Sequence, residues 1–388
     1  MIQEPADIPN QSPETAAPRI VLFLPSFGDG GVGRIFVHFA NGFSALGMAT
    51  DLMVKEDNHP YVDRLSSEVN RVLCRGRDDR ALAVELAEHV EKFRPSLVLS
   101  CQERDNHVAL DAKKRLGRSV PETRFVLLIA TSLGARTRLR HRFWWPRWRF
   151  QRKLRGLLGQ ADAVITNSEG TAADLAQFSG IQRERLVVLP SPTIPADILE
   201  LAARPVDHPW FETEQPPVIL GIGRLGRAKD FPTLLSAFAR VRHNLPCRLM
   251  ILGRGRQRDR LLEMARKLGV EEDFALPGYV VNPYAFLAKS SLFVLSSQWE
   301  GCPNALIEAL AIGTPAVSTD CPSGPREILG GGRYGRLTPP GDIEALADAM
   351  LHTLRNPLPA EWLRQAARKH TIENSCRNFL RAFALLPA

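Results

Sequence analysis

Residues 300–311 read Glu-Gly-Cys-Pro-Asn-Ala-Leu-Ile-Glu-Ala-Leu-Ala. Two short apolar runs flank them, Leu292 to Leu295 and Ala316 to Ser318. Proline suits the first turn of a helix, because the N–H that it lacks has no helical partner there. We therefore expect a helix to begin at Pro303, with Glu300 on the loop before it and Glu308 about one and a half turns inside. The stretch predicts a strand–helix–strand unit of a parallel sheet.

The same alternation of apolar runs and helical segments continues on both sides of this unit. Further runs are Ile20 to Leu24, Ala49 to Val54, Leu97 to Cys101, Phe125 to Ala130, Ala163 to Thr166, Val218 to Ile222 and Arg248 to Leu252. Continuous apolar runs are typical of strands buried on both faces of a parallel sheet. A proline-rich junction with Pro190, Pro192 and Pro195 interrupts the series and reads as a linker. The sequence therefore predicts two α/β domains.

The predicted organisation has four parts. They are a loose tail over residues 1–18, a first domain over 19–195, a second domain over 196–365 and a C-terminal helix over 366–388 that can pack on either domain. The length of 388 residues suits two domains of ordinary size, and 44% hydrophobic with 24% charged residues is typical of a globular chain. A disordered or fibrous protein is excluded.

The cysteines and the first 18 residues indicate in which cellular compartment the protein resides. None of the six cysteines forms a C-x-x-C pair, so we expect reduced thiols in a cytosol. Residues 1–18 are acidic and carry prolines, unlike a signal or transit peptide. No apolar run approaches the ~18 residues that a membrane span needs. We expect a cytoplasmic protein that does not cross a membrane.

The net charge of +8 is concentrated in one segment. Residues 136–155 hold eight arginines, one lysine and no acid, which leaves 41 basic against 42 acidic residues elsewhere. Phe143, Trp144, Trp145, Trp148 and Phe150 interleave with these cations. This mixture suits an anionic bilayer interface, although single-stranded nucleic acid or a solvated helix with buried tryptophans would also fit. We expect peripheral attachment to the cytoplasmic face of a membrane and no nucleic-acid partner.

A glycine loop follows the first predicted strand. It contains G-x-G-x-x-G at Gly28, Gly30 and Gly33 and leads into a helix, where backbone amides can approach a phosphate. A dinucleotide site also needs an acid near the end of the second strand, and Glu56 and Asp57 lie in roughly the right place. No tyrosine has a lysine four residues later, so the Tyr/Lys pair of short-chain dehydrogenases is missing. An NAD(P)-dependent oxidoreductase and a turn without ligand remain alternatives.

The second domain carries charged residues at the ends of its predicted strands. Gly221-Ile222-Gly223-Arg224-Leu225 follows the first of them, and Lys229 comes soon after. An arginine and a lysine released at the carboxyl end of a strand suit a diphosphate, although surface charge beside a turn would look the same. The amides of Cys302 and Asn304 at the predicted helix start can hold a phosphate or sugar oxygen. A buried Glu308 would need a hydroxyl or a cation.

Taken together, Gly221 to Lys229 and Glu300-x7-Glu308 resemble the retaining GT-B glycosyltransferases of glycosyltransferase family 4. The resemblance implies two Rossmann-like domains that face a cleft, with the C-terminal helix crossing back to the first domain. It implies that Arg224 and Lys229 neutralise the donor diphosphate. It also implies that Glu300 meets the donor sugar or its phosphate, and that Glu308 binds the ribose hydroxyls.

Further site residues follow from the same resemblance. Gly278-Tyr279-Val280 resembles the turn that contacts the base, and the glycine loop would touch the diphosphate from the other domain. The remaining nucleotide-binding residues that we expect are Gly30, Gly31, Gly223, Cys302, Pro303 and Asn304. Many members have a histidine after a strand of the first domain, where this chain reads Cys101 to His107. His107 is therefore a catalytic candidate, with an ordinary surface or helix-start histidine as the alternative.

The expected reaction is the retaining transfer of a hexose or N-acetylhexosamine from a nucleoside diphosphate sugar to a glycan acceptor. UDP is the favoured nucleotide because it is frequent in the family, and Thr319 to Glu327 resembles members that build polysaccharide or lipid-linked oligosaccharide. We expect a lipid-linked acceptor. No D-x-D occurs, so we expect neither metal nor cofactor. A non-catalytic basic protein that binds membrane or nucleic acid is a further alternative.

Overall fold

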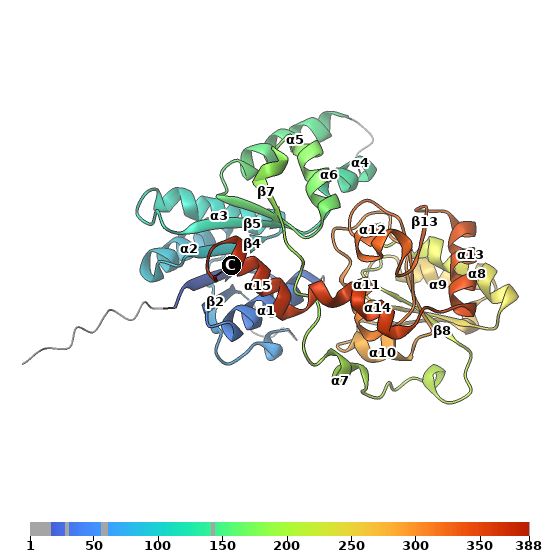
Figure 1. Cartoon of the computed structure of the whole chain (residues 1–388). Coiled ribbons are helices and arrows are strands. Elements are labelled where there is room, and N and C mark those ends of the chain that lie inside the picture. The colour runs from blue at the N-terminus through green and yellow to red at the C-terminus, as the bar shows by residue number, and fades with distance from the viewer. Residues whose placement is uncertain (1–16, 28–30, 56–60, 141–143, 388) are drawn as a thin grey trace, which may run out of the picture.

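The computed structural model describes residues 17–27, 31–55, 61–140 and 144–387, which form two α/β domains side by side (Figure 1). The first sheet has seven parallel strands in the order β3-β2-β1-β4-β5-β6-β7. Its strands are β1 (Arg19–Phe23), β2 (Ala49–Val54), β3 (Asn70–Leu73), β4 (Leu97–Cys101), β5 (Arg124–Ile129), β6 (Ala163–Thr166) and β7 (Leu186–Val188). The helices that cover it are α1 (Gly31–Ala45), α2 (Asp79–Phe93), α3 (Glu103–Leu116), α4 (Leu133–Arg140), α5 (Trp144–Leu158) and α6 (Glu169–Ser179).

The second sheet has six parallel strands in the order β10-β9-β8-β11-β12-β13. Its strands are β8 (Val218–Ile222), β9 (Arg248–Leu252), β10 (Phe274–Gly278), β11 (Leu292–Leu295), β12 (Ala316–Thr319) and β13 (Arg336–Thr338). The helices after β7 are α7 (Ile198–Ala202), α8 (Phe231–Asn244), α9 (Arg258–Lys267), α10 (Pro283–Lys289), α11 (Asn304–Ile312), α12 (Pro325–Ile328), α13 (Ile343–Arg355), α14 (Ala360–Ala367) and α15 (Ile372–Ala382). No described helix has both the length and the apolar character of a membrane span.

Both faces of each sheet are buried, which explains the continuous apolar runs of the central strands. In β1, Ile20 and Leu22 pack in the core that includes α1, whereas Val21 and Phe23 pack in the core that includes α2. Successive side chains of a strand point to opposite faces, so a strand with helices on both faces needs apolar residues at every position. The prediction of doubly covered parallel sheets is confirmed.

In both sheets the strand order reverses beside the first strand of the domain. The reversal lies between β1 and β4 in the first sheet and between β8 and β11 in the second. Ligands of open α/β sheets bind at such switch points, outside the carboxyl ends of the strands. We therefore expect a ligand site near the segments that follow β1 and β4, and near those that follow β8 and β11.

The C-terminal segment, red in Figure 1, joins the two domains a second time. Helix α14 packs on α11 of the second domain, and α15 then packs on α1 of the first. The Phe379 ring lies 5.5 Å from that of Phe39 and 5.0 Å from that of Phe43. This crossing back of the C-terminal helix confirms the expectation. The crossing lies at Thr371, which bridges Ile194 of the linker, a few residues beyond the expected boundary at 365.

Candidate active site

The loop after β8 places a lysine directly over a glycine. A Cβ atom added to Gly223 would lie 2.7 Å from Cε of Lys229, so only glycine leaves room for this side chain. The ammonium of Lys229 then reaches Glu300, with 2.6 Å between Nζ and Oε1. Arg224, in the same loop, is exposed. The loop thus presents two cations at the carboxyl end of β8.

Glu300 is held from two sides. Ser297, one of two serines directly after β11, donates a hydrogen bond to Oε1 of Glu300 at 2.5 Å. The other serine, Ser296, donates to the carbonyl of Lys229 at 2.7 Å, which ties the two loops together. The side chains of Lys229 and Glu300 are 19% and 13% exposed, so the pair can still meet a ligand. Sequence reasoning did not single out either serine.

Helix α11 begins beside the first domain. Pro303 is the residue before its first turn and is buried, as expected for a helix start there. Asn304 accepts a hydrogen bond from Thr193 of the linker at 3.2 Å. A Cβ atom on Gly31 would lie 2.8 Å from the side-chain nitrogen of Asn304, so the glycine allows this approach. The two expected binding segments therefore meet.

The cysteine before α11 is not a nucleophile at neutral pH. Burial raises the pKa of the Cys302 thiol to about 12. A thiol is a strong nucleophile only as a thiolate. Cys302 therefore contributes its backbone and its volume to the site rather than covalent chemistry.

Glu308, inside α11, is buried and pairs with a residue of the other domain. Its side chain is 1% exposed and accepts a hydrogen bond from the guanidinium of Arg34, on α1. Burial raises the pKa of Glu308, while the positive charges of Arg34 and Lys229 oppose that rise. The expected cation partner of a buried Glu308 is thus present. Arg34 was missed, because the direction of its side chain cannot be read from its place in the sequence.

The turn after β10 also reaches the first domain. Gly278 has a φ of +96°, which favours glycine. Tyr279 is 39% exposed, carries Arg254 5.7 Å from its ring centre, and donates a hydrogen bond to the hydroxyl of Tyr61 at 3.3 Å. Val280 is half-buried against the core of the second domain. Tyr61 and Tyr279 also interact electrostatically with Arg34, the partner of Glu308, so the turn lies near that pair.

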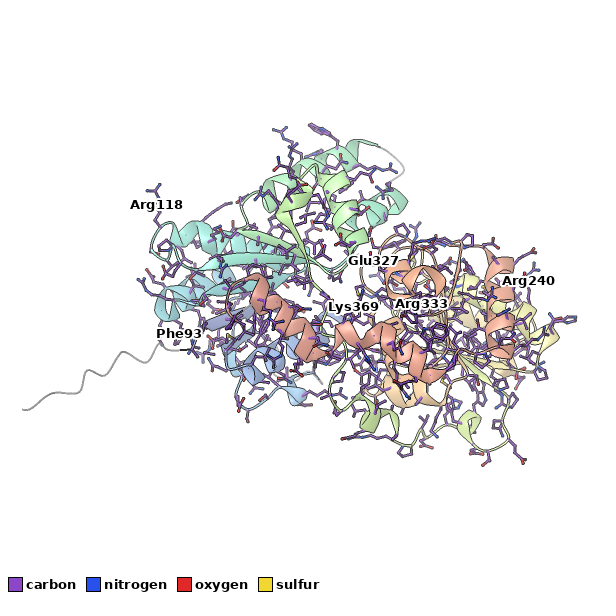
Figure 2. All side chains as sticks on the ribbon, in the orientation of Figure 1. Phe93, Arg118, Arg240, Glu327, Arg333 and Lys369 are labelled. Carbon is purple, nitrogen blue, oxygen red and sulfur yellow. The ribbon has the colours of Figure 1, made fainter. Side chains whose placement is uncertain are left out.

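Backbone contacts close the two domains on each other beside these groups. A Cβ on Gly301 would lie 2.1 Å from the carbonyl oxygen of Ala130, and the amide of Ser132 donates to the carbonyl of Glu300 at 3.1 Å. Farther along, Glu327 on α12 lies on the side of the second domain that faces the first (Figure 2). Its carboxylate accepts hydrogen bonds from the amides of Glu169 and Gly170, at 2.9 and 2.7 Å. These contacts hold the two domains together beside Gly31 of the first domain and the predicted residues of the second.

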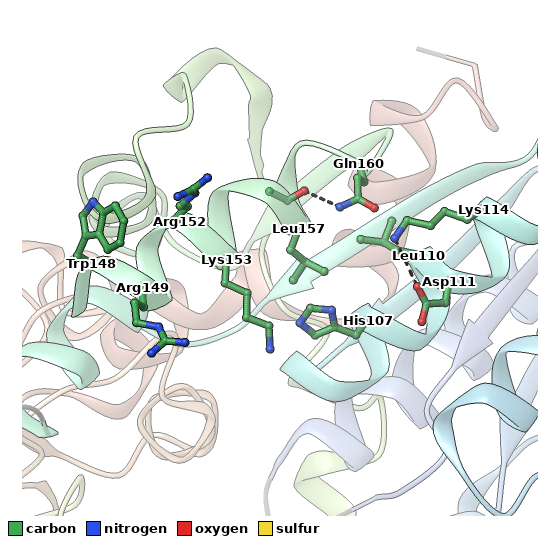
Figure 3. Close-up of a pocket in the computed structure, with 11 residues that line it drawn as sticks. His107, Leu110, Asp111, Lys114, Trp148, Arg149, Arg152, Lys153, Leu157 and Gln160 are labelled. Atoms are coloured by element: carbon green, nitrogen blue, oxygen red, sulfur yellow. Dashed lines mark hydrogen bonds and ion pairs between the residues drawn. The ribbon is translucent and has the colours of Figure 1, made fainter. Parts of the chain in front are cut away.

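His107 does not join this site. It lies on α3 and faces α5, where burial and Lys153 lower its pKa (Figure 3). The residue directly after β4 is Gln102, whereas His107 is already in the second turn of α3. The charged residues described around His107 belong to α3 and α5. The expected catalytic position of His107 is therefore not supported by the geometry.

His107 instead lines a basic groove of about 530 Å³ between α3 and α5. The charged and aromatic residues of this basic groove are Asp111 and Lys114 of α3 and Trp148, Arg149, Arg152 and Lys153 of α5 (Figure 3). The Trp148 side chain is 48% exposed, with Arg152 5.8 Å from its ring centre. Other cations of the segment are engaged: Arg138 binds Asp174 at 2.8 Å.

Three of the expected features lie partly or wholly outside the described residues. Gly28 and Gly30 of the glycine loop, with Glu56 and Asp57 and residues 141–143, lie outside the described residues. Within the described ranges, no group of three or more His, Cys, Asp and Glu side chains is placed to hold a metal ion.

Comparison with known proteins agrees with this architecture. Residues 29–195 match the family described as glycosyltransferase family 4, and residues 207–370 match the glycosyl transferases group 1. The class is thus that of the GT-B glycosyltransferases. Within it, the chain belongs to glycosyltransferase family 4. This assignment favours a glycosyltransferase over an oxidoreductase or a non-catalytic basic protein, and it confirms the expected resemblance.

Solved structures share the whole fold. A glycosyltransferase of Rickettsia africae ESF-5 superposes with a TM-score of 0.73 at 15% identity, over 95% of this chain and 98% of its own. The Anabaena protein Alr3699/HepE, solved with UDP and glucose, gives 0.73 at 16% identity, over 95% and 100%. At such low identity the likeness shows the fold alone, and it confirms the expected GT-B architecture.

Curated relatives match over shorter stretches. The Campylobacter jejuni N-acetylgalactosamine-N,N'-diacetylbacillosaminyl-diphospho-undecaprenol 4-alpha-N-acetylgalactosaminyltransferase is 32% identical over 210 residues, 54% of each chain. The lipopolysaccharide core biosynthesis glycosyltransferase LpsE of Rhizobium meliloti is 33% identical over 190 residues, 49% of this chain and 53% of its own. The matched stretches thus span about half the length of these relatives.

Proposed function

We propose that the protein transfers a hexose or N-acetylhexosamine from a nucleoside diphosphate sugar to a lipid-linked glycan acceptor, with retention at the anomeric carbon. The observation that carries the proposal is the contact of Lys229 with Glu300 at 2.6 Å, at the carboxyl ends of β8 and β11. The start of α11 and the buried Glu308 follow directly. Lys229 is complementary to a diphosphate, Glu300 to a sugar and Glu308 to a ribose.

The leaving group is the part of the reaction that this site can assist. As the bond between the anomeric carbon and the diphosphate oxygen breaks, its electron pair stays on the diphosphate. Arg224, Lys229 and the amides at the start of α11 supply fixed positive charge for that oxygen. The acceptor hydroxyl attacks on the face that the diphosphate leaves, and a phosphate oxygen takes its proton. This step needs no side-chain nucleophile, in keeping with the protonated thiol of Cys302.

UDP is the nucleotide that we propose. The Anabaena neighbour was solved with UDP and glucose, and the Campylobacter relative is named as a transferase of N-acetylgalactosamine. Tyr279 and Val280 would contact the base, and Glu308 the ribose hydroxyls. Since the chain has no D-x-D, we propose that Arg224 and Lys229 take the place of a divalent metal.

The acceptor that we propose is carried by a lipid on the cytoplasmic face of an anionic membrane. The name of the Campylobacter relative describes a sugar on diphospho-undecaprenol. In this chain, Arg149, Arg152 and Lys153 are exposed on α5 beside the half-exposed indole of Trp148 (Figure 3). Exposed cations beside an indole suit anionic headgroups at a bilayer interface. The basic groove therefore supports peripheral membrane binding of the first domain.

A panel of nucleotide sugars tests the function. Each is incubated with the full-length protein, with and without lipid-linked saccharides, and the released nucleoside diphosphate is measured. We expect release from a UDP-sugar that increases when the acceptor is present, and an NMR coupling in the product that shows the donor's anomeric configuration. Inversion at that carbon, or no release from any sugar nucleotide, would contradict the proposal.

A further inference from the structure

The ion pair between Arg34 and Glu308 joins the two domains at a place that is nearly closed to solvent. The Arg34 side chain is 12% exposed and that of Glu308 is 1% exposed. The guanidinium lies 5.8 Å from the ring centre of Tyr284, on α10. Arg34 belongs to α1, the helix that follows the glycine loop of the first domain. Glu308 therefore receives its closest counter-charge from the opposite domain.

A buried carboxylate needs such a counter-charge. Moving a lone carboxylate out of water is so unfavourable that the group takes up a proton instead. The second domain offers only a more distant cation in the described chain, Lys229, and its ammonium already contacts Glu300. Without Arg34, Glu308 would thus hold its proton to higher pH.

The protonation state decides what Glu308 can bind. A carboxylate offers two acceptor oxygens, which match the two hydroxyl donors of a ribose diol. In a carboxylic acid one of the two oxygens carries a proton and acts as a donor, so the group no longer matches the two donors of that diol. The nucleotide site therefore depends on whatever keeps Glu308 ionised.

We propose that Arg34 is a positioning residue of the donor site, which holds Glu308 as a carboxylate for the ribose hydroxyls when the two domains are closed. The inference rests on the proposed nucleotide-sugar function and adds a residue of the first domain to it. It also makes nucleotide affinity depend on domain closure, because Arg34 and Glu308 lie on different domains.

The other titratable groups around the pair stay in one form near neutral pH. Tyr284 faces Glu308 from α10, and burial raises its pKa to about 12. Burial also raises the pKa of Tyr61, which lies just before the 3-10 helix Val62–Arg64. On α1 itself, burial and then the charge of Arg34 lower the pKa of His38 to about 3. Because Arg34 also acts on His38, a change in affinity between pH 6.5 and 9 reports on Glu308 when it depends on both Arg34 and Glu308.

The test measures UDP affinity by isothermal titration calorimetry at several pH values from 6.5 to 9. In the wild type we expect little change across this range. Arg34→Met should bind UDP at least about tenfold more weakly at pH 7, since one unit of pKa corresponds to a factor of ten, and should recover most of the loss at pH 9. Arg34→Lys should keep the wild-type profile. Arg118→Met, at an exposed arginine, is the matched control.

A double variant ties the effect to Glu308. The pH dependence of Arg34→Met should vanish in Arg34→Met/Glu308→Gln, because residue 308 then has no proton to lose. Circular dichroism checks that each variant is folded, and Arg34→Gln replaces Arg34→Met if the latter is unstable.

Three results would overturn the inference. Wild-type affinity in Arg34→Met at every pH would show that Arg34 has no role at the donor site. An equal loss at every pH would show a structural role only. A wild-type protein that binds none of UDP, GDP or ADP would overturn the proposed function and this inference together, whereas the first two results leave the function standing.

Discussion

The proposed donor cleft, formed around Arg34, Lys229, Glu300 and Glu308, and the basic groove both contain many charged residues. The two regions differ in the sign and burial of these charges. In the cleft, Arg34 and Glu308 come from different domains, have opposite signs and are nearly buried. In the groove, Arg149, Arg152 and Lys153 share one helix and one sign, and all are exposed. Removing one partner of a buried pair leaves an uncompensated charge, whereas an exposed cation acts weakly and is screened by salt. Single substitutions should therefore matter in the cleft, and only combined ones in the groove.

The largest effect should come from the catalytic end of the cleft. Glu300→Ala should lower kcat by about 10²- to 10³-fold, a range typical for the loss of one transition-state contact, and change UDP affinity only a few-fold. The reason is that a contact to the reacting sugar can strengthen as the bond breaks. Steady-state kinetics and UDP titration separate the two quantities, with the exposed Glu361→Ala as control. Weaker UDP binding with an unchanged kcat would show that Glu300 only binds.

Glu308→Ala should act mainly on binding. It removes the proposed ribose contact and leaves the guanidinium of Arg34 buried without its partner. Hydrogen bonds to charged groups are worth about 1.5–3 kcal/mol, so UDP affinity should fall by roughly 10²-fold. The exposed Glu344→Ala serves as the matched control. Unchanged affinity in a folded Glu308→Ala protein would remove the ribose from this part of the cleft.

The groove should respond only when several cations change. Replacing Arg149, Arg152 and Lys153 by glutamate should reduce binding to anionic liposomes at least about 10²-fold, since each cation near such a surface contributes about 1 kcal/mol. UDP affinity should not change. Replacing Arg118, Arg240 and Lys267 by glutamate makes the same charge change elsewhere on the surface. Co-sedimentation at low and high salt measures the effect.

Two results would contradict the proposal that the basic groove binds an anionic membrane. If the wild type ignores anionic liposomes at low salt, the membrane proposal fails. If it prefers a single-stranded oligonucleotide to them, the groove serves a nucleic acid instead.

Chelation should have the smallest effect. We expect transfer activity to survive EDTA within about twofold, since Arg224 and Lys229 already supply the positive charge that a metal would bring to the diphosphate. Activity assays before and after dialysis against EDTA check this. Loss of activity that manganese or magnesium restores would show that a divalent ion takes part.

The central strands could be predicted from the sequence, but the edge strands could not. The strands that the sequence did not indicate are β3, β7, β10 and β13, which are the outer strands of the two sheets. Three of the four residues of β3 are exposed. An outer strand has a neighbour on one side only and lacks helices over much of its surface, so it needs no continuous apolar run.

The residues of the site also divide into those that could be predicted from the sequence and those that could not. Lys229, Glu300 and Glu308 stand in a spacing that a resemblance can detect, and the structure brings them together. Arg34 and Ser297 depend on how the two domains and two loops meet, which no local pattern encodes. His107 was proposed because many family members have a histidine after a strand of the first domain, but here one turn of helix directs it to α5.

The most direct test of the central claim is a calorimetric titration of UDP and, separately, NADH into the wild type, Lys229→Ala and Glu308→Ala. The account predicts that UDP binds the wild type at a single site, that both substitutions weaken it, and that NADH does not displace it. Tighter binding of NADH than of UDP, or UDP affinity that neither substitution changes, would contradict a nucleotide-sugar site between Lys229 and Glu308.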